Sequence, residues 1–115
     1  MSERDVSTVA GHYQDGLALA VRGEWFEAHE SFELAWRACE QRERDFFQGL
    51  VHVVVAWYQA GRGNEVGFER QLEKAERRLG PFAPTHRGVE VDHLLRQVAA
   101  ARAAGSLDPP PLDVP

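Results

Sequence analysis

The chain has 115 residues, which is enough for one domain with a hydrophobic core and too short for two domains. Its composition, 43% hydrophobic and 27% charged, is that of an ordinary folded protein and argues against global disorder. The formal net charge of -5 disfavours nonspecific nucleic-acid binding, because binding of that kind needs a clustered cationic surface.

Cysteine content and hydropathy indicate the compartment. The single cysteine, Cys39, cannot form an internal disulfide, which fits a reducing compartment, and its place on an apolar helix stripe predicts a buried thiol. The N-terminal residues lack the basic and apolar pattern of an export signal. The longest apolar run, around Val53 to Tyr58, is far shorter than the ~20 residues that span a bilayer. We therefore expect a cytoplasmic protein that binds neither membranes nor nucleic acid.

Apolar residues at helical spacing predict a first helix over about residues 4–22 and a second over about residues 24–41. Gly23 separates them, because glycine readily adopts the left-handed conformation that ends a helix. Such a short connection makes the second helix run back antiparallel to the first.

The third helix, predicted over about residues 45–60, is the most apolar part of the chain. An apolar surface this wide is typical of the central helix of a bundle. Gly49 costs about 1 kcal/mol of helix propensity relative to alanine, so we expect it to permit close approach of a neighbouring helix. Gln48 and His52 lie together on the remaining polar strip of this helix.

Two more helices are predicted over about residues 65–79 and 89–104. No stretch alternates with period two, so a sheet is not expected. The prediction is an all-α fold, an antiparallel bundle of about five helices with the third at its centre. Residues 1–105 would form this single domain, and residues 106–115 would form a flexible, proline-rich tail outside it.

Two parts of the chain resemble each other at an offset that suits a helical hairpin. Gly23-Glu24 and the helix reaching Phe32-Glu33-Leu34-Ala35 correspond to Gly63-Asn64-Glu65 and the helix reaching Leu72-Glu73-Lys74-Ala75. Two copies are too few for a solenoid. They fit a small helical-hairpin interaction module of the tetratricopeptide type.

The second helix carries a polar motif, His-Glu-x-x-Glu, within an aromatic stripe. His29 lies on the same face as Trp36 and is expected to be buried. His29 and Glu33 are four residues apart, so their side chains can converge on one point. Imidazole and carboxylate suit a divalent metal such as zinc, iron or manganese. The helical zinc-hydrolase motif His-Glu-x-x-His is similar but has a second histidine, which this chain lacks.

A third metal ligand would have to come from another helix. His52, with Gln48 on the same face, is the natural donor, so the predicted metal set is His29, Glu33 and His52. In a hydrolytic site, Glu30 or Glu33 would act as general base or ligand, His29 as ligand or proton shuttle, and Gln48 as an orienting group.

Two other interpretations use the same residues. In the first, His29 is a neutral core residue bonded to Glu33 or to a backbone carbonyl, and Glu30 pairs with Arg37 or Arg44. In the second, the residues line a pocket for a ligand or a protein partner. That predicted pocket comprises His29, Glu30, Glu33, Trp36 and Gln48.

The other histidines and the tryptophans carry less functional information. The remaining histidines are expected on solvated surface, and these are His12, His86 and His93. The tryptophans are expected in the core because all lie on apolar stripes, and these are Trp25, Trp36 and Trp57.

The segment Glu-Trp-Phe-Glu-Ala-His-Glu-x-x-Glu-x-x-Trp over residues 24–36, followed by a Gln-Gly pair and then Gly63-Asn64, resembles domain-of-unknown-function family 309. The resemblance covers about Tyr13 to Leu79. It implies an all-α bundle built round the histidine–glutamate helix, and it implies no activity. The hallmark positions that it implies are His29, Glu30, Glu33, Trp36, Gln48 and Gly49. His52 is not among them.

Three functional hypotheses follow from the sequence. The first is a polar pocket between the second and third helices that binds a divalent metal or catalyses hydrolysis. The alternative is a helical-hairpin module that binds a protein partner and has no catalytic activity. The third is a homodimer formed through surplus apolar surface on the first or the last helix.

Overall fold

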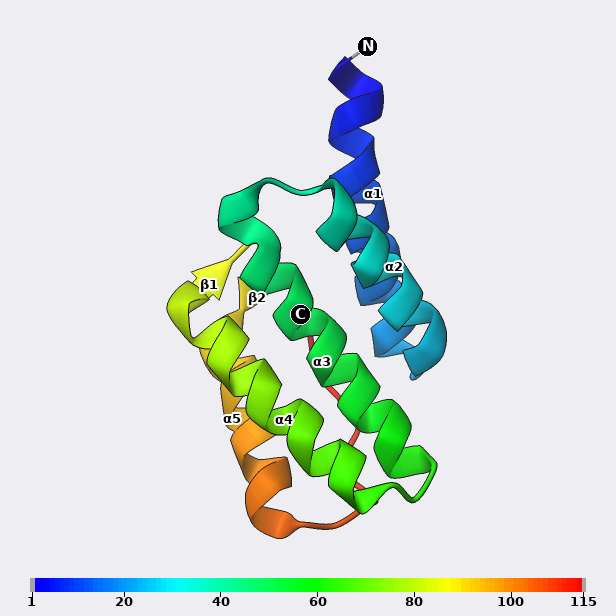
Figure 1. The fold of residues 1–115 in the computed structure, drawn as a ribbon, viewed down its shortest axis with the longest axis vertical. Helices are drawn as coiled ribbons and strands as arrows, with labels where there is room; N and C mark the ends of the chain where they lie inside the picture. Colours follow the sequence, from blue (N-terminus) through cyan, green and yellow to red (C-terminus); the bar gives the residue numbers. More distant parts are fainter. Residues whose placement is uncertain (1, 115) are drawn as a thin grey trace.

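Residues 2–114, the part of the chain that the computed structural model describes, form five α-helices, and side chains are described from Val9 onward. The helices are α1 (Ser2–Val21), α2 (Trp25–Ala38), α3 (Arg44–Gly61), α4 (Glu65–Leu79) and α5 (Val91–Ala104). Each helix packs against the next one along the chain (Figure 1). The prediction of an all-α bundle is confirmed, and α4 begins and ends where the sequence predicts.

The first two hairpins, α1–α2 and α3–α4, have the same turn. Gly23 and Gly63 both lie in the left-handed region, at φ of +76° and +75°. In each turn the glycine N–H donates to the carbonyl three residues back at 3.0 Å. The N–H of the next residue, Glu24 or Asn64, donates to the carbonyl five residues back at 3.0 or 2.9 Å. This double bond pattern is the Schellman motif, in which glycine avoids the steric cost of a positive φ.

The two hairpins also bury corresponding side chains. Positions related by the same offset as Gly23 and Gly63 are buried in both hairpins: Ala20 and Ala60, Ala28 and Phe68, Phe32 and Leu72, Ala35 and Ala75. The resemblance seen in the sequence is therefore a structural duplication of one helical hairpin, to which α5 is added.

Helix α3 lies at the centre, with α2 on one side and α4 on the other (Figure 1). Its buried residues face both neighbours and include Phe46, Phe47, Leu50, Val53, Val54 and Trp57. Among the helices of residues 2–114, none is both long enough and apolar enough to cross a membrane.

The connection between α4 and α5 contains a two-stranded hairpin that the sequence did not predict. After the 3-10 turn η2 (Gly80–Phe82), strand β1 (Thr85–His86) pairs antiparallel with β2 (Val89–Glu90). The pairing delays the start of α5 to Val91. Likewise, α2 ends at Ala38 and is followed by a separate 3-10 turn, η1 (Gln41–Glu43).

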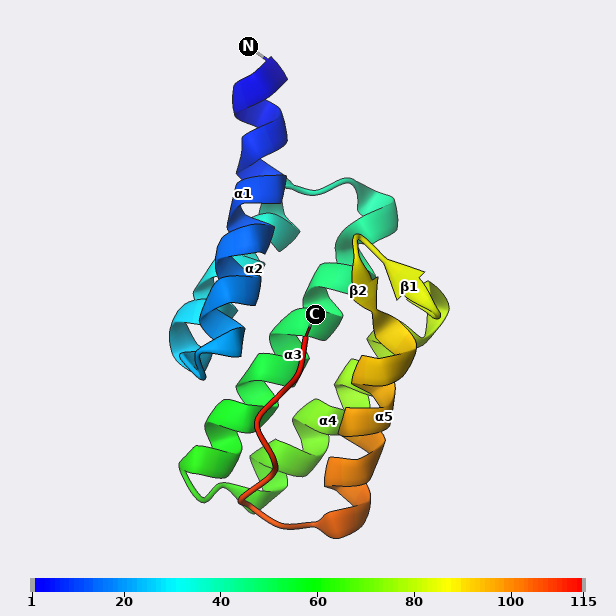
Figure 2. The same ribbon diagram turned by 180° about the vertical axis from the view of Figure 1, so that it is seen from behind.

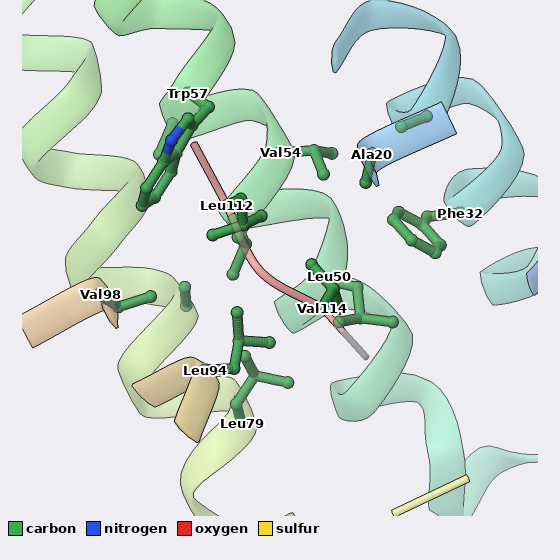
Figure 3. Close-up of a cluster of buried hydrophobic side chains, with 14 of the residues drawn as sticks. Ala20, Phe32, Leu50, Val54, Trp57, Leu79, Leu94, Val98, Leu112 and Val114 are labelled. Carbon is green, nitrogen blue, oxygen red and sulfur yellow. The ribbon is translucent and has the colours of Figure 1, made fainter. Parts of the chain in front are cut away.

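The C-terminal segment, defined here as residues 106–114, returns along α3 between α1 and α5 (Figure 2). The sequence predicts a flexible tail at this point, but Leu112 and Val114 are only 6% and 7% exposed. Their side chains lie among residues of four helices, including Ala20, Phe32, Leu50 and Leu94 (Figure 3). Two aliphatic residues two positions apart carry no helix or strand periodicity, so only the tertiary structure reveals that they join the core.

Gly49 provides a test of the packing between α3 and α4. A Cβ atom at this position would lie 2.6 Å from Cγ of Leu79 and 2.7 Å from its Cδ2, so the two helices approach closely as expected. We predict that Gly49→Ala lowers the free energy of unfolding by about 1–3 kcal/mol through overpacking, although alanine has the higher helix propensity.

Gly11→Ala is the matched control, because a Cβ atom there would meet nothing within 4 Å. This substitution should raise stability by up to about 1 kcal/mol. Urea denaturation of both variants measures the difference, and an equal effect at the two sites would contradict close packing at Gly49.

Candidate functional site

His29 and Glu33 lie side by side on α2, as their spacing predicts. Nε2–H of His29 donates to Oε2 of Glu33 at 3.0 Å, and Oε1 of Glu33 is 3.7 Å from Nη2 of Arg37. The His29 side chain is 26% exposed and that of Glu33 is 40% exposed. The pair therefore lies at the rim of the buried face rather than within it. Contact with water lowers the cost of the Glu33 charge.

Aromatic rings link His29 to α3. The ring of Phe26 lies 5.7 Å from that of His29 and 5.8 Å from that of Tyr58 on α3, measured between centroids. Phe26 is 48% exposed, and Glu30 is exposed as well. Partly exposed aromatic rings thus lie beside the imidazole–carboxylate pair. The pair itself offers two metal ligands or one proton relay.

Trp36 contributes to packing rather than to this pair. The guanidinium of Arg44 stacks over the indole ring at 4.1 Å from its centroid, a cation–π contact that joins α2 to the start of α3. Nε1 of Trp36 is buried and has no hydrogen-bond partner in the described part of the chain. Arg44 is therefore engaged with Trp36, although the sequence suggested a pairing with Glu30.

His52 faces α4. Its Nδ1 lies 2.7 Å from Oε1 of Gln71, and burial lowers the pKa of His52, an effect that the nearby cations of α4 reinforce and the hydrogen bond opposes. Gln48, one turn earlier on α3, is half-buried. Among side chains of residues 9–114, no group of three His, Cys, Asp or Glu is spaced to hold a metal ion. The structure thus brings His29 and Glu33 together without assembling the predicted three-ligand set with His52.

A second polar cluster, which the sequence did not predict, centres on Glu43. Nε and Nη2 of Arg87 donate to its two oxygens at 2.6 and 2.8 Å, and Nε2 of His86 donates at 2.9 Å. The Glu43 side chain is only 13% exposed. The hydrogen bonds from Arg87 are the main reason why the pKa of Glu43 falls to about 2, while burial opposes them. His86, expected on solvated surface, instead packs its ring 4.5 Å from that of Phe46.

This Glu43 cluster ties the β1–β2 hairpin to the rest of the bundle. The hydroxyl of the buried Tyr13 donates to the carbonyl of Arg87 at 2.5 Å, and burial raises the pKa of Tyr13 to about 12. Arg87 and Gly88 form the hairpin turn at φ of +49° and +81°. Two left-handed residues between short strands are typical of a type I′ turn, so the Arg-Gly pair was the local signal that could have revealed it.

Two side chains hold the backbone of the C-terminal segment. Nε1 of Trp57 donates to the carbonyl of Pro110 at 3.0 Å. The amide of Gln97 bonds twice to Asp113, donating to its carbonyl at 2.7 Å and accepting from its N–H at 2.8 Å. Nε2 of His93 lies 3.1 Å from the Asp113 carboxylate. These contacts could not be predicted from the sequence, because their residues come from α3, α5 and the segment itself.

The family assignment rests on the two hairpins. The model of the family described as Domain of unknown function (DUF309) matches residues 13–71, just over half of the chain. The chain belongs to this family. Comparisons with curated proteins and with solved structures gave no match. The DUF309 match contains the His29–Glu33 pair and Trp57, whereas the β1–β2 hairpin, α5 and the C-terminal segment lie outside it.

The Glu43 cluster predicts a defined pH dependence of stability. The pKa of Glu43 is about 2 in the folded protein and 4.5 in its ordinary state, so the bonded carboxylate stabilises the fold fully above pH 4.5. That stabilisation, on the order of 3 kcal/mol, is lost progressively as pH falls from 4.5 through about 2. The stability difference between wild type and Glu43→Gln should therefore be largest near neutral pH and shrink as pH falls.

Chemical denaturation from pH 7 down to pH 3 measures this difference. Glu30→Gln removes a carboxylate from the exposed surface of α2 and should give only a small difference in stability. If Glu43→Gln behaved like Glu30→Gln, the cluster would not stabilise the fold.

Proposed function

We propose that the protein is a cytoplasmic interaction module, built of helical hairpins and without catalytic activity, that binds an extended segment of polypeptide. The observation that carries this proposal is the tail groove, the surface of α1, α2, α3 and α5 on which the C-terminal segment lies (Figure 2). A groove that accepts one extended segment through backbone and side-chain contacts has the chemistry to accept others.

The groove recognises backbone and side chains separately. The Gln97 amide and the Trp57 indole bond to backbone atoms, which every peptide carries. Leu112 and Val114 enter an apolar site whose residual cavity has a volume of only ≈ 10 Å³. The tight fit favours aliphatic side chains two positions apart, whereas the backbone contacts hold the segment extended. This division between general and selective contacts is typical of peptide-binding grooves.

The free energies of these contacts indicate that the chain's own segment occupies the groove most of the time. Full burial of one aliphatic side chain contributes about 1.5–3 kcal/mol, and each hydrogen bond adds about 1 kcal/mol. A tethered segment has an effective concentration in the millimolar range, which a free peptide has to exceed. A direct binding test therefore needs a chain whose own segment has been released.

The full-length double variant Leu112→Asp/Val114→Asp provides such a chain, because two carboxylates are not tolerated in the apolar site. A fluorescent peptide with the sequence of residues 105–115 should bind this variant, and bind wild type at least ~10-fold more weakly because the wild-type groove is occupied. Fluorescence anisotropy measures binding, and circular dichroism verifies that the variant keeps its helices.

Two controls make the result specific. Adding Gln97→Ala to the released variant removes both bonds to Asp113 and should weaken peptide binding by roughly 10-fold. A peptide carrying aspartate in place of Leu112 and Val114 should not bind. If the folded, released variant failed to bind the wild-type peptide, the interaction-module proposal would be refuted.

The His29–Glu33 pair supports a second candidate, a metal-binding or hydrolytic site. The supporting observation is the 3.0 Å approach of Nε2 to Oε2, which places two ligand atoms at one point of α2. Glu30 is one residue away and is the nearest additional carboxylate in sequence. A partner molecule or water would have to complete the coordination.

The metal content of the purified protein tests this second candidate function. If it holds, protein purified without chelator should contain stoichiometric metal, and His29→Ala should lose it. Zinc or manganese should also raise the thermal midpoint of wild type but not of His29→Ala. Elemental analysis and thermal unfolding measure both effects. Metal below stoichiometric amounts, together with an unchanged midpoint, would leave the pair with a surface role only.

A further inference from the structure

We infer that the C-terminal segments of two copies of this chain exchange, each filling the tail groove of the other, to give a reciprocal dimer. The inference rests on the proposed function, since it names a second copy as the partner that the groove accepts. Exchange of an identical element between protomers leads to a closed, two-fold symmetric assembly.

The contacts that hold the segment lie at its far end. Pro110 is bonded by Trp57, Asp113 by Gln97, and Leu112 and Val114 are buried. Each of these contacts joins the segment to α1, α2, α3 or α5. The same groove residues are present in every copy of the chain, so a segment from a second copy makes the same contacts as the chain's own.

The connector, residues 105–109, is held much more loosely. An open concavity of ≈ 440 Å³ separates it from the α1–α2 turn, with Val21 and Gly23 in the lining. Another, of ≈ 330 Å³, lies between it and α5, lined by Ala100 and Ala104 among others. The chain thus has open space on both sides before it enters the groove, although the partly buried Leu107 packs against the core and this contact is broken when the connector changes direction.

The chain reverses direction within this connector. Gly105 ends α5 in the left-handed conformation, at φ of +65°, and the N–H of Asp108 bonds back to the hydroxyl of Ser106 at 3.1 Å. A rotation at Gly105, loss of this exposed bond and release of Leu107 from the core straighten the reversal. The three prolines that follow, residues 109–111, favour a stiff extended conformation. The far end of the segment therefore reaches a groove, its own or another, in the same shape.

The equilibrium between closed monomer and exchanged dimer depends on concentration and on the connector. The groove contacts are the same in both forms. The free-energy difference between monomer and dimer therefore comes from association entropy, strain in the connector and charge repulsion. Each chain carries a formal charge of -5, so repulsion opposes association at low salt. Added salt screens that repulsion and should increase the dimer fraction.

A complementation experiment on full-length chains tests the exchange. The first variant, Trp57→Phe/Gln97→Ala, lacks both groove donors and keeps an intact segment. The second, Leu112→Asp/Val114→Asp, keeps an intact groove and lacks a segment that fits. Mixing the two should give a complex of twice the monomer mass by light scattering, and neither variant should form it alone. A first variant that also carries the Leu112→Asp/Val114→Asp changes should form no complex.

Wild-type chain gives an independent result if a variant folds poorly. Its mass should rise toward that of a dimer with concentration, and an excess of free peptide with the sequence of residues 105–115 should return it to the monomer mass. Deleting Ser106 and Leu107 should raise the dimer fraction, because the shorter connector cannot close on its own groove. Inserting a flexible Gly-Ser pair after Gly105 should lower it.

The outcomes separate the two proposals. If the released variant binds the free peptide but the variant mixture and concentrated wild type both remain monomeric, the exchange inference is overturned and the interaction module stands. If the released variant folds and binds no peptide, the groove is not a peptide-binding site and both proposals fail. Dimers that persist in excess peptide would form through a different surface and would also overturn the exchange.

Discussion

The wide apolar surface of α3 is the constraint on which the structure depends. Its buried side chains point in too many directions for one neighbouring helix to cover them. Helix α2 covers one side, α4 covers the other, and the C-terminal segment closes the gap that remains beside Leu50 and Val54 (Figure 3). Burial of apolar area is the main favourable term in folding, so each covering element is stabilised by the same central helix.

This arrangement explains why a duplicated hairpin does not simply continue as a repeat. In a longer array, the exposed side of each hairpin would be covered by the next one. Here α5 covers α4, and the C-terminal segment covers Leu50 and Val54 of α3. An extended segment can follow a narrow gap in which a helix would not fit. The groove is therefore a consequence of ending the array after two hairpins.

Local features of the fold were predictable from the sequence, since they depend on neighbours within one or two turns. Apolar periodicity located the helices, Gly23 located the first turn, and the spacing of His29 and Glu33 predicted their contact. The close approach at Gly49 was also predictable, because a glycine inside an apolar helix needs a packing reason. These predictions needed no knowledge of which helix lies beside which.

The remaining features depend on long-range contacts. His52 lies on the polar strip of α3 as expected. The packing of α4 determines which helix this strip faces, and the hydrogen-bond partner of His52 on α4 is Gln71. Glu43 and Arg87 are 44 residues apart, and Trp57 and Pro110 are 53 apart. No periodicity links such pairs. The Glu43 cluster and the tail groove were missed for this reason.

The same difference in sequence separation has a consequence for the order of folding. The two Schellman turns join residues that are close in sequence, so each hairpin can form early, whereas the contacts of the C-terminal segment close the longest loops and form late. Late contacts of this kind are also among the first to open in the native state. The groove therefore forms before the C-terminal segment binds to it. Between these two steps, the nearest suitable segment binds in the groove.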